Sequence, residues 1–594
     1  DGRITSRPGA FRSTVQANAS LATAVQVMEP DDEGLAWAVS HVKAWIQLQQ
    51  SQPNQRRISL VLANYPVRDG RLANGVGLDT PTSTASILGW LQESGHDLGG
   101  NPIPADGQEL MKHLLRSRTN DPESQNRQPL SYLSLSQYLK WWKTLPVEAC
   151  EPIVKRWGLP DQAEDLEADG FAIHGILFGQ VVVMIQPSRG YDSNEIADLH
   201  SPDLPPPHRY LAQYLWMREV HATNLLIHVG KHGSAEWLPG KGVGLSQSCY
   251  PNLALGAVPH AYPFIVNDPG EGSQAKRRGA AVIIDHLTPP LGRAGLHGDL
   301  LRLESLLDEY VEATQLGAKR VYKLEEELLN LLRLNNFPGL PEVFDKSESC
   351  RDLLITSFEQ AEAYLCELKE SQIRTGLHRF GQAPSDKSAI ELLLAIARSP
   401  SSDQPGLTQA IARRLELNCD PWCDEEGELL SNHDSKVLIS FGLDKARRKG
   451  DAVAWIEEQA LMFLNVLLDK KQIEKRKGND ENLLVKPLRD WLKSAKSDPL
   501  ISRIEHDLWP RLITSPRKEY EALLKAVSGR RIASGPSGAP TRGRPEVLPT
   551  GRNFYSVDLR GLPTEAAWDL GQRSAEQLLD LHLLEHGEPL THLA

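Results

Sequence analysis

The sequence has few cysteines, no long apolar run and no excess of basic residues. Its 594 residues contain six Cys, which are too few for a disulfide framework and typical of a reducing cytosol. The most apolar run, residues 171–185, has about 15 residues, including a His and a Gln, whereas a membrane-spanning helix needs about 20 apolar residues. The 65 Lys and Arg against 77 Asp and Glu give a formal net charge of −12, which argues against a nucleic-acid or anionic-membrane binder.

The sequence also lacks the signatures of export and of ATP binding. No signal peptide opens it, so the expected location is cytoplasmic. No Gly-x4-Gly-Lys-Ser/Thr phosphate loop occurs, and residues 240–244, Gly-Lys-Gly-Val-Gly, have the wrong spacing for one. If the chemistry of this protein needs ATP, we therefore expect another chain to bind and hydrolyse it.

Length and composition indicate a multidomain globular protein. The length suggests roughly four domains, and 24% charged residues with 40% apolar residues exclude wholesale disorder. We expect, in order, an α/β region with a Gly-rich strand-end loop, an α/β core with His and Glu motifs, a mostly helical region, and a Gly/Pro/Arg loop that starts a further, truncated domain. Their expected ranges are residues 1–165, 166–345, 346–533 and 534–594.

Short apolar runs and helical patterns predict the fold class. Residues 58–64, 181–186 and 224–228 have the composition of buried parallel strands, and helical patterns over residues 83–94 and 208–221 alternate with them. This alternation predicts an α/β fold with a largely parallel sheet. In the second half of the chain, periodic Leu among Glu, Lys and Arg predicts mostly helices.

Two imidazoles and a carboxylate lie within nine residues in one motif, His228-Val-Gly-Lys-His232-Gly-Ser-Ala-Glu236. The motif follows a predicted strand, and its two glycines make a helix unfavourable, so we expect a loop at the carboxyl edge of the sheet, where open α/β sheets bind ligands. Imidazole and carboxylate groups bind divalent metals and transfer protons. The alternative is structural: Glu236 caps a turn, or pairs at the surface with Lys231 or Lys241.

A second motif extends over residues 262–278. Asp268 is suited to cap a helix, Pro269 to be its first residue, and Glu271 to complete a start similar to a capping box. Local helix chemistry therefore explains the beginning of this motif. It does not explain the basic cluster at residues 276–278, which suits carboxylates on a substrate or a partner surface.

Several of these runs together resemble the large, tetrapyrrole-binding subunit of ATP-dependent metal chelatases. One branch of this family inserts cobalt into a corrin precursor, hydrogenobyrinic acid a,c-diamide, and the other inserts magnesium into protoporphyrin IX. Glu236-Trp-Leu-Pro-Gly and Asn267-Asp-Pro-Gly-Glu resemble the cobalt branch. Family members are longer at both ends, so we expect an internal fragment or one piece of a split subunit. The runs that carry the resemblance are residues 61–81, 228–246, 262–278, 285–290 and 535–556.

The resemblance implies an enzyme that inserts Co²⁺, or Mg²⁺ in the alternative branch, while an AAA+ ATPase subunit and an adaptor subunit supply ATP hydrolysis. It implies that Glu236 is a base or a metal-delivering carboxylate, and that His228 and His232 handle the metal or relay protons. The candidates to pair with peripheral carboxylates of the tetrapyrrole are Arg68, Arg71, Arg189, Lys276, Arg277 and Arg542, chosen by residue type and loop position.

Two readings of other classes remain open at the level of sequence. The first is a tetrapyrrole-binding carrier or sensor without turnover. The second is a stand-alone metallohydrolase built on His228, His232 and Glu236. Neither reading involves nucleic acid or a membrane span.

Overall fold

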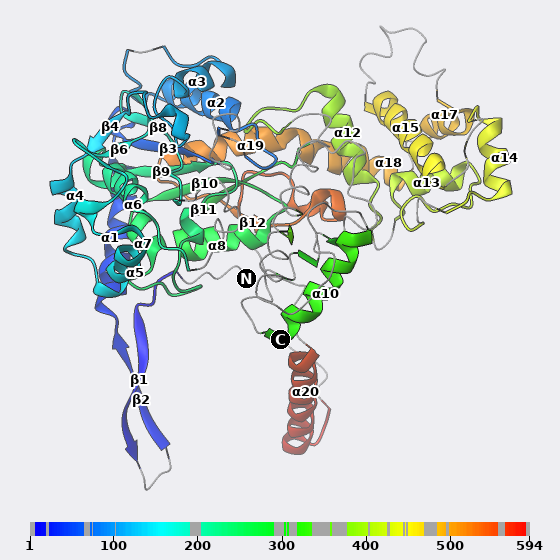
Figure 1. Cartoon of the computed structure of the whole chain (residues 1–594). Coiled ribbons are helices and arrows are strands. Elements are labelled where there is room, and N and C mark those ends of the chain that lie inside the picture. The colour runs from blue at the N-terminus through cyan, green and yellow to red at the C-terminus, as the bar shows by residue number, and fades with distance from the viewer. Residues whose placement is uncertain are drawn as a thin grey trace.

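The computed structural model shows an α/β body with a helical region on one side (Figure 1). Among the residues that it describes, no helix is long and apolar enough to cross a membrane. A two-stranded antiparallel ribbon, β1 (Ala10–Asn18) with β2 (Thr23–Pro30), projects from the body. The described residues are 6–18, 23–64, 72–73, 75–100, 102–190, 203–289, parts of 302–361, 377–401, 404–424, 428–443, 446, 449–468, 484–494, 498–555 and 565–589.

A six-stranded sheet forms the centre of the body, in the order β11-β10-β9-β3-β8-β7. All neighbouring strands are parallel except the β7–β8 pair. Every residue of β3, β8, β9 and β10 is buried, as expected for a parallel sheet that is covered on both faces. The predicted α/β fold with a largely parallel sheet is therefore confirmed. The strands are β3 (Ile58–Leu62), β7 (Gly175–Phe178), β8 (Val181–Ile185), β9 (Leu225–Val229), β10 (His260–Ile265) and β11 (Val282–His286).

Helices from distant parts of the chain cover the two faces of the sheet. One core contains Leu60 of β3, Ile87 of α2 and Leu523 of α19. The other contains Val61 of β3 with Tyr210 of α6 and many aromatic residues. The covering helices are α1 (Asp32–Gln50), α2 (Thr80–Glu93), α3 (Gly107–Leu114), α4 (Leu135–Trp142), α5 (Val147–Trp157), α6 (His208–Leu215), α7 (Tyr250–Leu255), α8 (Pro269–Gly279) and α19 (Trp509–Val527).

The central sheet and its covering helices come from more than one of the expected regions. The sheet takes β3 from the first expected region and its other strands from the second, and α19 comes from the third. A small parallel pair, β12 (Ser534–Pro536) with β13 (Asn553–Tyr555), belongs to the fourth. Asp285 of β11 holds this segment, because its Oδ1 accepts from the backbone N–H of Arg552 at 2.7 Å. A three-stranded antiparallel sheet precedes β7 in the sequence. Its strand order is β4 (Ser131–Leu133), β6 (Gly170–Ile173) and β5 (Leu166–Glu167).

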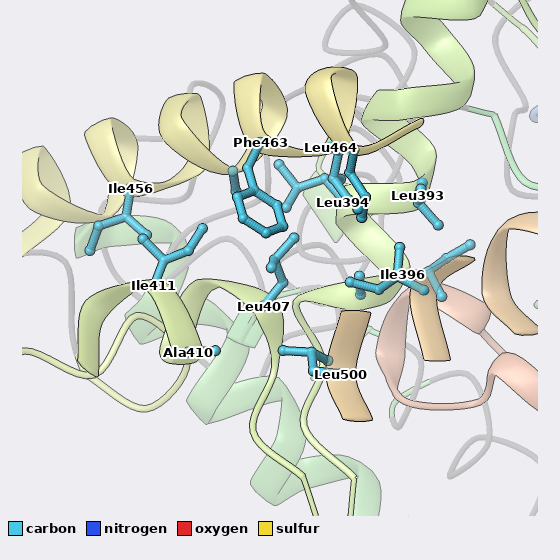
Figure 2. Close-up of a cluster of buried hydrophobic side chains, with 14 of the residues drawn as sticks. Leu393, Leu394, Ile396, Leu407, Ala410, Ile411, Ile456, Phe463, Leu464 and Leu500 are labelled. Carbon is cyan, nitrogen blue, oxygen red and sulfur yellow. The ribbon is translucent and has the colours of Figure 1, made fainter. Parts of the chain in front are cut away.

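The predicted helical half is also present. Side chains of α12, α13 and α15 meet in one apolar cluster, with Leu407 and Ile411 facing Ile456 and Phe463 (Figure 2). Residues 361–369, in the half of the chain where periodic Leu predicts helices, lie outside the described residues apart from one position. The described helices here are α10 (Ala318–Leu334), α12 (Asp386–Ala397), α13 (Leu407–Arg414), α14 (Asn432–Ser440), α15 (Lys449–Leu468), α17 (Lys486–Lys493), α18 (Pro499–Arg503) and, projecting at the end, α20 (Glu565–His586).

Candidate functional site at the carboxyl edge of the sheet

Three segments converge where β3, β9 and β10 end. The loop after β9 carries Lys231, whose backbone carbonyl accepts from the N–H of Val76 at 2.9 Å in the Gly-rich segment. The side chain of Lys231 forms an ion pair with Asp268, which follows β10 and caps α8. The carboxyl ends of parallel strands meet at one edge, so residues far apart in the sequence share this site.

Glu236 is the buried carboxyl of this edge. It lies in the short 3-10 helix Ala235–Trp237, is 2% exposed, and its Oε2 has no hydrogen-bond partner among the described residues. Burial, reinforced by the charge of Glu271, raises the pKa of Glu236 to about 7, although its own N–H, Tyr262 and Arg278 act against the shift. A carboxyl with such a pKa exchanges a proton readily near neutral pH.

Gly233 makes the close approach of this carboxyl sterically feasible. A Cβ at position 233 would lie 2.7 Å from both carboxylate oxygens of Glu236 and 2.8 Å from the hydroxyl of Tyr262. These distances are well below the van der Waals contact distance between a carbon and an oxygen atom, so a side chain at position 233 would collide with Glu236 and Tyr262. The glycine of the motif therefore serves the packing of Glu236 and not only the turn.

An ionic cluster lies beside Glu236 and joins the loop after β9 to the first turn of α8. Nδ1 of His232 lies 2.9 Å from Oε2 of Glu271, and Nζ of Lys231 lies 3.3 Å from Oε1 of the same carboxylate. Burial opposes the charge of Lys231, but the carboxylates of Glu271 and Asp268 outweigh it and raise the pKa of Lys231. Asp268 caps α8 as predicted, since its side chain accepts from the N–H of Glu271. The Glu271 side chain pairs with Lys231 and His232, where the sequence suggested a capping box.

His228 is held in a chain of hydrogen bonds inside the sheet. Nδ1 of His260 donates to the carbonyl oxygen of Gly279 at 3.1 Å, so Nε2 of His260 accepts from Nδ1 of His228 at 2.9 Å. Nε2 of His228 then accepts from the hydroxyl of Tyr214 at 3.0 Å. Burial, followed by the charge of His260, lowers the pKa of His228 well below its usual range. Both ring nitrogens of His228 are therefore used within the protein.

The three residues expected to handle metal are thus divided between two places. His232 and Glu236 both lie near Glu271. His228 lies inside the sheet, where its ring centroid is 5.4 Å from that of Tyr262, which hydrogen-bonds Glu236. Within the described part of the chain, no three His, Cys, Asp or Glu side chains are grouped so that they could hold a metal ion.

The basic residues expected to bind carboxylates have different environments. Arg189 is buried and donates to the carbonyl oxygen of Leu204 at 3.0 Å. Lys276 is also buried, and burial lowers its pKa to about 8. Arg277 and Arg542 are exposed. Arg68 and Arg71 lie outside the described residues.

Three further residues belong to the site, although the sequence indicated Glu271 only as part of a helix start and Arg278 only as part of a basic cluster. Arg278 is buried and donates to the carbonyl oxygen of Leu238 at 2.5 Å, directly after the 3-10 helix of Glu236. Tyr262 hydrogen-bonds the carbonyl oxygen of Gly230 at 3.3 Å. The third is Glu271. One signal was available, because Glu271 and Arg278 are seven residues apart and so lie on one face of α8.

A separate cavity of about 440 Å³ opens at the base of the β1–β2 ribbon. Arg7, Trp37 and Lys241 are among its lining residues, and the guanidinium of Arg7 lies 4.5 Å from the ring centroid of Trp37. None of His228, His232 and Glu236 lines it. The cavity is therefore distinct from the buried edge described above.

The whole chain, residues 1–594, matches the family model described as CobN/Magnesium Chelatase. Its curated relatives include an aerobic cobaltochelatase subunit CobN from Pseudomonas aeruginosa, 41% identical across 100% of this chain and 46% of the relative. They also include the magnesium-chelatase H protein of Chlorobaculum parvum, 28% identical across 92% of this chain and 41% of the relative.

A solved structure is similar over nearly the whole chain. It is the catalytic subunit of cobaltochelatase from Mycobacterium tuberculosis, 32% identical, with a TM-score of 0.64 over 99% of this chain and 46% of that one. The present chain thus spans about half the length of the relatives that it matches. The family match and these identities confirm the predicted resemblance: the chain belongs to the CobN/magnesium chelatase family.

Proposed function

We propose that this chain is the tetrapyrrole-binding and metal-inserting part of a cobaltochelatase large subunit. The substrates would be Co²⁺ and a free-base corrin precursor, hydrogenobyrinic acid a,c-diamide. Support comes from the two CobN relatives at 41% and 39% identity, compared with 28% for the magnesium-chelatase H protein. The structural observation that most supports this proposal is the buried carboxyl group of Glu236 at the carboxyl edge of the sheet.

Glu236 would act as the base of the insertion reaction. A ring N–H that becomes a cobalt–nitrogen bond must lose its proton, and this proton needs an acceptor inside the site. Glu236 has an oxygen without a partner among the described residues and a pKa raised to about 7. It can therefore take the proton and return it to solvent in the next cycle.

His232 and Glu236 would contact Co²⁺ in transit. Imidazole and carboxylate are both accepted ligands of first-row divalent metals. The contact between His232 and Glu271 supports this role, because a carboxylate on one ring nitrogen fixes the orientation of a ligating imidazole. His228 would be a positioning residue, since it forms hydrogen bonds with Tyr214 and His260 inside the sheet.

ATP hydrolysis would come from partner chains. The sequence contains no phosphate loop, and an AAA+ ATPase subunit with an adaptor subunit would supply the energy. Arg68, Arg71, Arg189, Lys276, Arg277 and Arg542 remain the proposed partners of peripheral carboxylates. The exposed pair, Arg277 and Arg542, can reach an external ligand without any rearrangement.

The proposal is tested by absorbance titration of the purified chain. Hydrogenobyrinic acid a,c-diamide should bind more tightly than protoporphyrin IX, and the isolated chain should release no phosphate from ATP. A preference for the porphyrin would assign the chain to the magnesium branch. Tight corrinoid binding without cobalt insertion, in a reconstituted assay with ATPase and adaptor, would make it a carrier.

A further inference from the structure

Helix α1 has apolar side chains on two opposite faces, and the inner face anchors it to the body. The inner face consists of Trp37, His41, Trp45 and Leu48. Nε2 of His41 accepts from Nε1 of Trp45 at 3.0 Å, so Nδ1 of His41 donates to the carbonyl oxygen of Ala257 at 3.1 Å. Leu48 is fully buried in the core that α2 and α19 share with the sheet. These contacts fix the position of α1 and leave its other face pointing outward.

The outer face of α1 is an apolar stripe that the described residues leave exposed. Its four side chains are spaced by four, three and four residues, which places them along one line of a helix with 3.6 residues per turn. The stripe consists of Leu35, Val39, Val42 and Ile46, which are 42%, 67%, 57% and 46% exposed. A surface helix normally has polar residues opposite its packed face. Apolar side chains at this spacing are the pattern that a second helix contacts when it packs against the first.

The two edges of the stripe are nearly neutral and partly small. Ala36 and Ala38 lie beside it, and small side chains let a second helix come close. One cation and one anion, Lys43 and Asp32, lie near it in the helical periodicity, so their charges balance. An apolar helix therefore fits this surface better than a segment with a strong charge of one sign.

The size of the stripe favours an occupant that belongs to the same polypeptide. From Leu35 to Ile46 the stripe is about 17 Å long, and on a helix about 10 Å wide it covers on the order of 200 Å². A stable interface between separate proteins, including two copies of this chain, buries about 800 Å² on each partner. A connected segment needs less area, because its connection gives it an effective concentration on the order of millimolar.

The relatives of this chain contain enough additional polypeptide to supply such a segment. The chain matches 46% of each of the two CobN relatives and 46% of the solved cobaltochelatase subunit, so more than half of each lies outside the matched part. We propose that the outer stripe of α1 is the docking surface for an apolar helix from the part of the large subunit that lies outside this chain. The inference goes beyond the proposed function, since neither tetrapyrrole binding nor cobalt insertion is needed for it.

The test measures how accessible the stripe is in two forms of the protein. Val39→Cys is introduced into this chain and into the full-length large subunit, and its reaction with a maleimide is followed by mass spectrometry of the peptide, which separates it from the native cysteines. We expect the reaction in the full-length subunit to be slower by at least about tenfold, because a packed helix excludes the reagent until it opens. Ser40→Cys is the matched control, since Ser40 is exposed and lies about 100° round α1 from Val39. Its rate should be the same in both forms.

Val42→Glu in the full-length subunit gives a second measurement. A charge inside the apolar contact should release the docked helix, so the rate of Val39→Cys should return toward that of the present chain, whereas Val42→Ile should not change it. Both positions are exposed in this chain, so its Tm should stay the same in these variants. Equal Val39→Cys rates in the two forms overturn the proposal. Protection that grows with protein concentration also overturns it and assigns the stripe to a second copy, as does protection that requires the ATPase or the adaptor, which assigns it to a partner chain.

Discussion

Nδ1 of His232 lies 2.9 Å from Oε2 of Glu271, so the first turn of α8 fixes the imidazole that follows β9. The same carboxylate pairs with Lys231 and adds to the raised pKa of Glu236. Glu271 thus links the ionic cluster to the buried acid. Glu271, which the sequence indicated as part of a helix start, therefore interacts with Lys231, His232 and Glu236.

Replacement of Glu271 by Gln should change both stability and pH dependence. Lys231 is mostly buried and would keep Asp268 as its one ionic partner among the described residues, so we expect a loss of about 1–3 kcal/mol in the free energy of unfolding. Because the charge of Glu271 raises the pKa of Glu236, its removal lowers that pKa. A base acts when deprotonated, so the rise of insertion rate with pH should move to lower pH.

Urea unfolding and a pH–rate profile measure these two effects of Glu271→Gln. Glu521→Gln is the control, since Glu521 pairs with Arg517 and Lys518 on the surface of α19 and should change stability by at most about 1 kcal/mol. An unmoved pH profile would show that Glu271 does not act on the base.

Gly233→Ala should impair insertion without unfolding the chain. The new methyl group would displace the carboxylate of Glu236, which lies 2.7 Å from the Cβ position. Because proton transfer needs a well-placed base, we expect the insertion rate to fall by at least about tenfold. Gly242→Ala is the matched control in the following loop, because nothing lies within 4 Å of its Cβ position. Equal insertion rates for the two variants would contradict the close packing of Glu236.

Glu519 should make stability depend on acid pH. This carboxylate of α19 is fully buried and accepts hydrogen bonds from Nε2 of His378 at 2.8 Å and from the N–H groups of Leu287 and Gly381, both at 2.9 Å. Although burial opposes ionisation, the charge and hydrogen bond of His378 lower the pKa of Glu519 from 4.5 to about 2. The folded pKa lies below the unfolded one, so its contribution is complete above the unfolded pKa and is lost as pH falls through the folded value.

Urea unfolding between about pH 5 and pH 2 measures this contribution, which is on the order of 3 kcal/mol. Glu519→Gln should be less stable than wild type at neutral pH, and its stability should fall less steeply across this range. Glu585→Gln, on the exposed face of α20, should follow wild type. A Glu519→Gln curve parallel to wild type would contradict the assignment.

The strands near the site followed from the sequence, but the roles of the polar residues did not. The runs 58–64, 181–186 and 224–228 are mostly apolar, so their composition predicted the buried strands β3, β8 and β9. The predicted strand 224–228 ends at His228, so the sequence placed His228 in the sheet and His232 in the loop after it, as β9 confirms, but it did not show that His228 bonds to His260. The local sequence does not show this hydrogen bond, because the partner belongs to the neighbouring strand β10.

Long-range partners were the least predictable part. Glu519 hydrogen-bonds Leu287 directly after β11, His378, and Thr550 before β13. No local sequence pattern indicates such a cluster. His174 appeared only as a polar interruption of an apolar run. Neither of its ring nitrogens has a hydrogen-bond partner among the described residues, and this depends on how β6, β7 and residues 117–120 pack.

The most direct measurement is the cobalt insertion rate of Glu236→Gln in a reconstituted assay with full-length subunit, ATPase and adaptor. Gln keeps the shape of the side chain but cannot accept the ring proton as a carboxylate does, so we predict a loss of at least about a hundredfold. Tetrapyrrole affinity should change by less than about tenfold, because the carboxylate acts on the barrier and not on macrocycle binding. Near-normal insertion by Glu236→Gln would contradict the account.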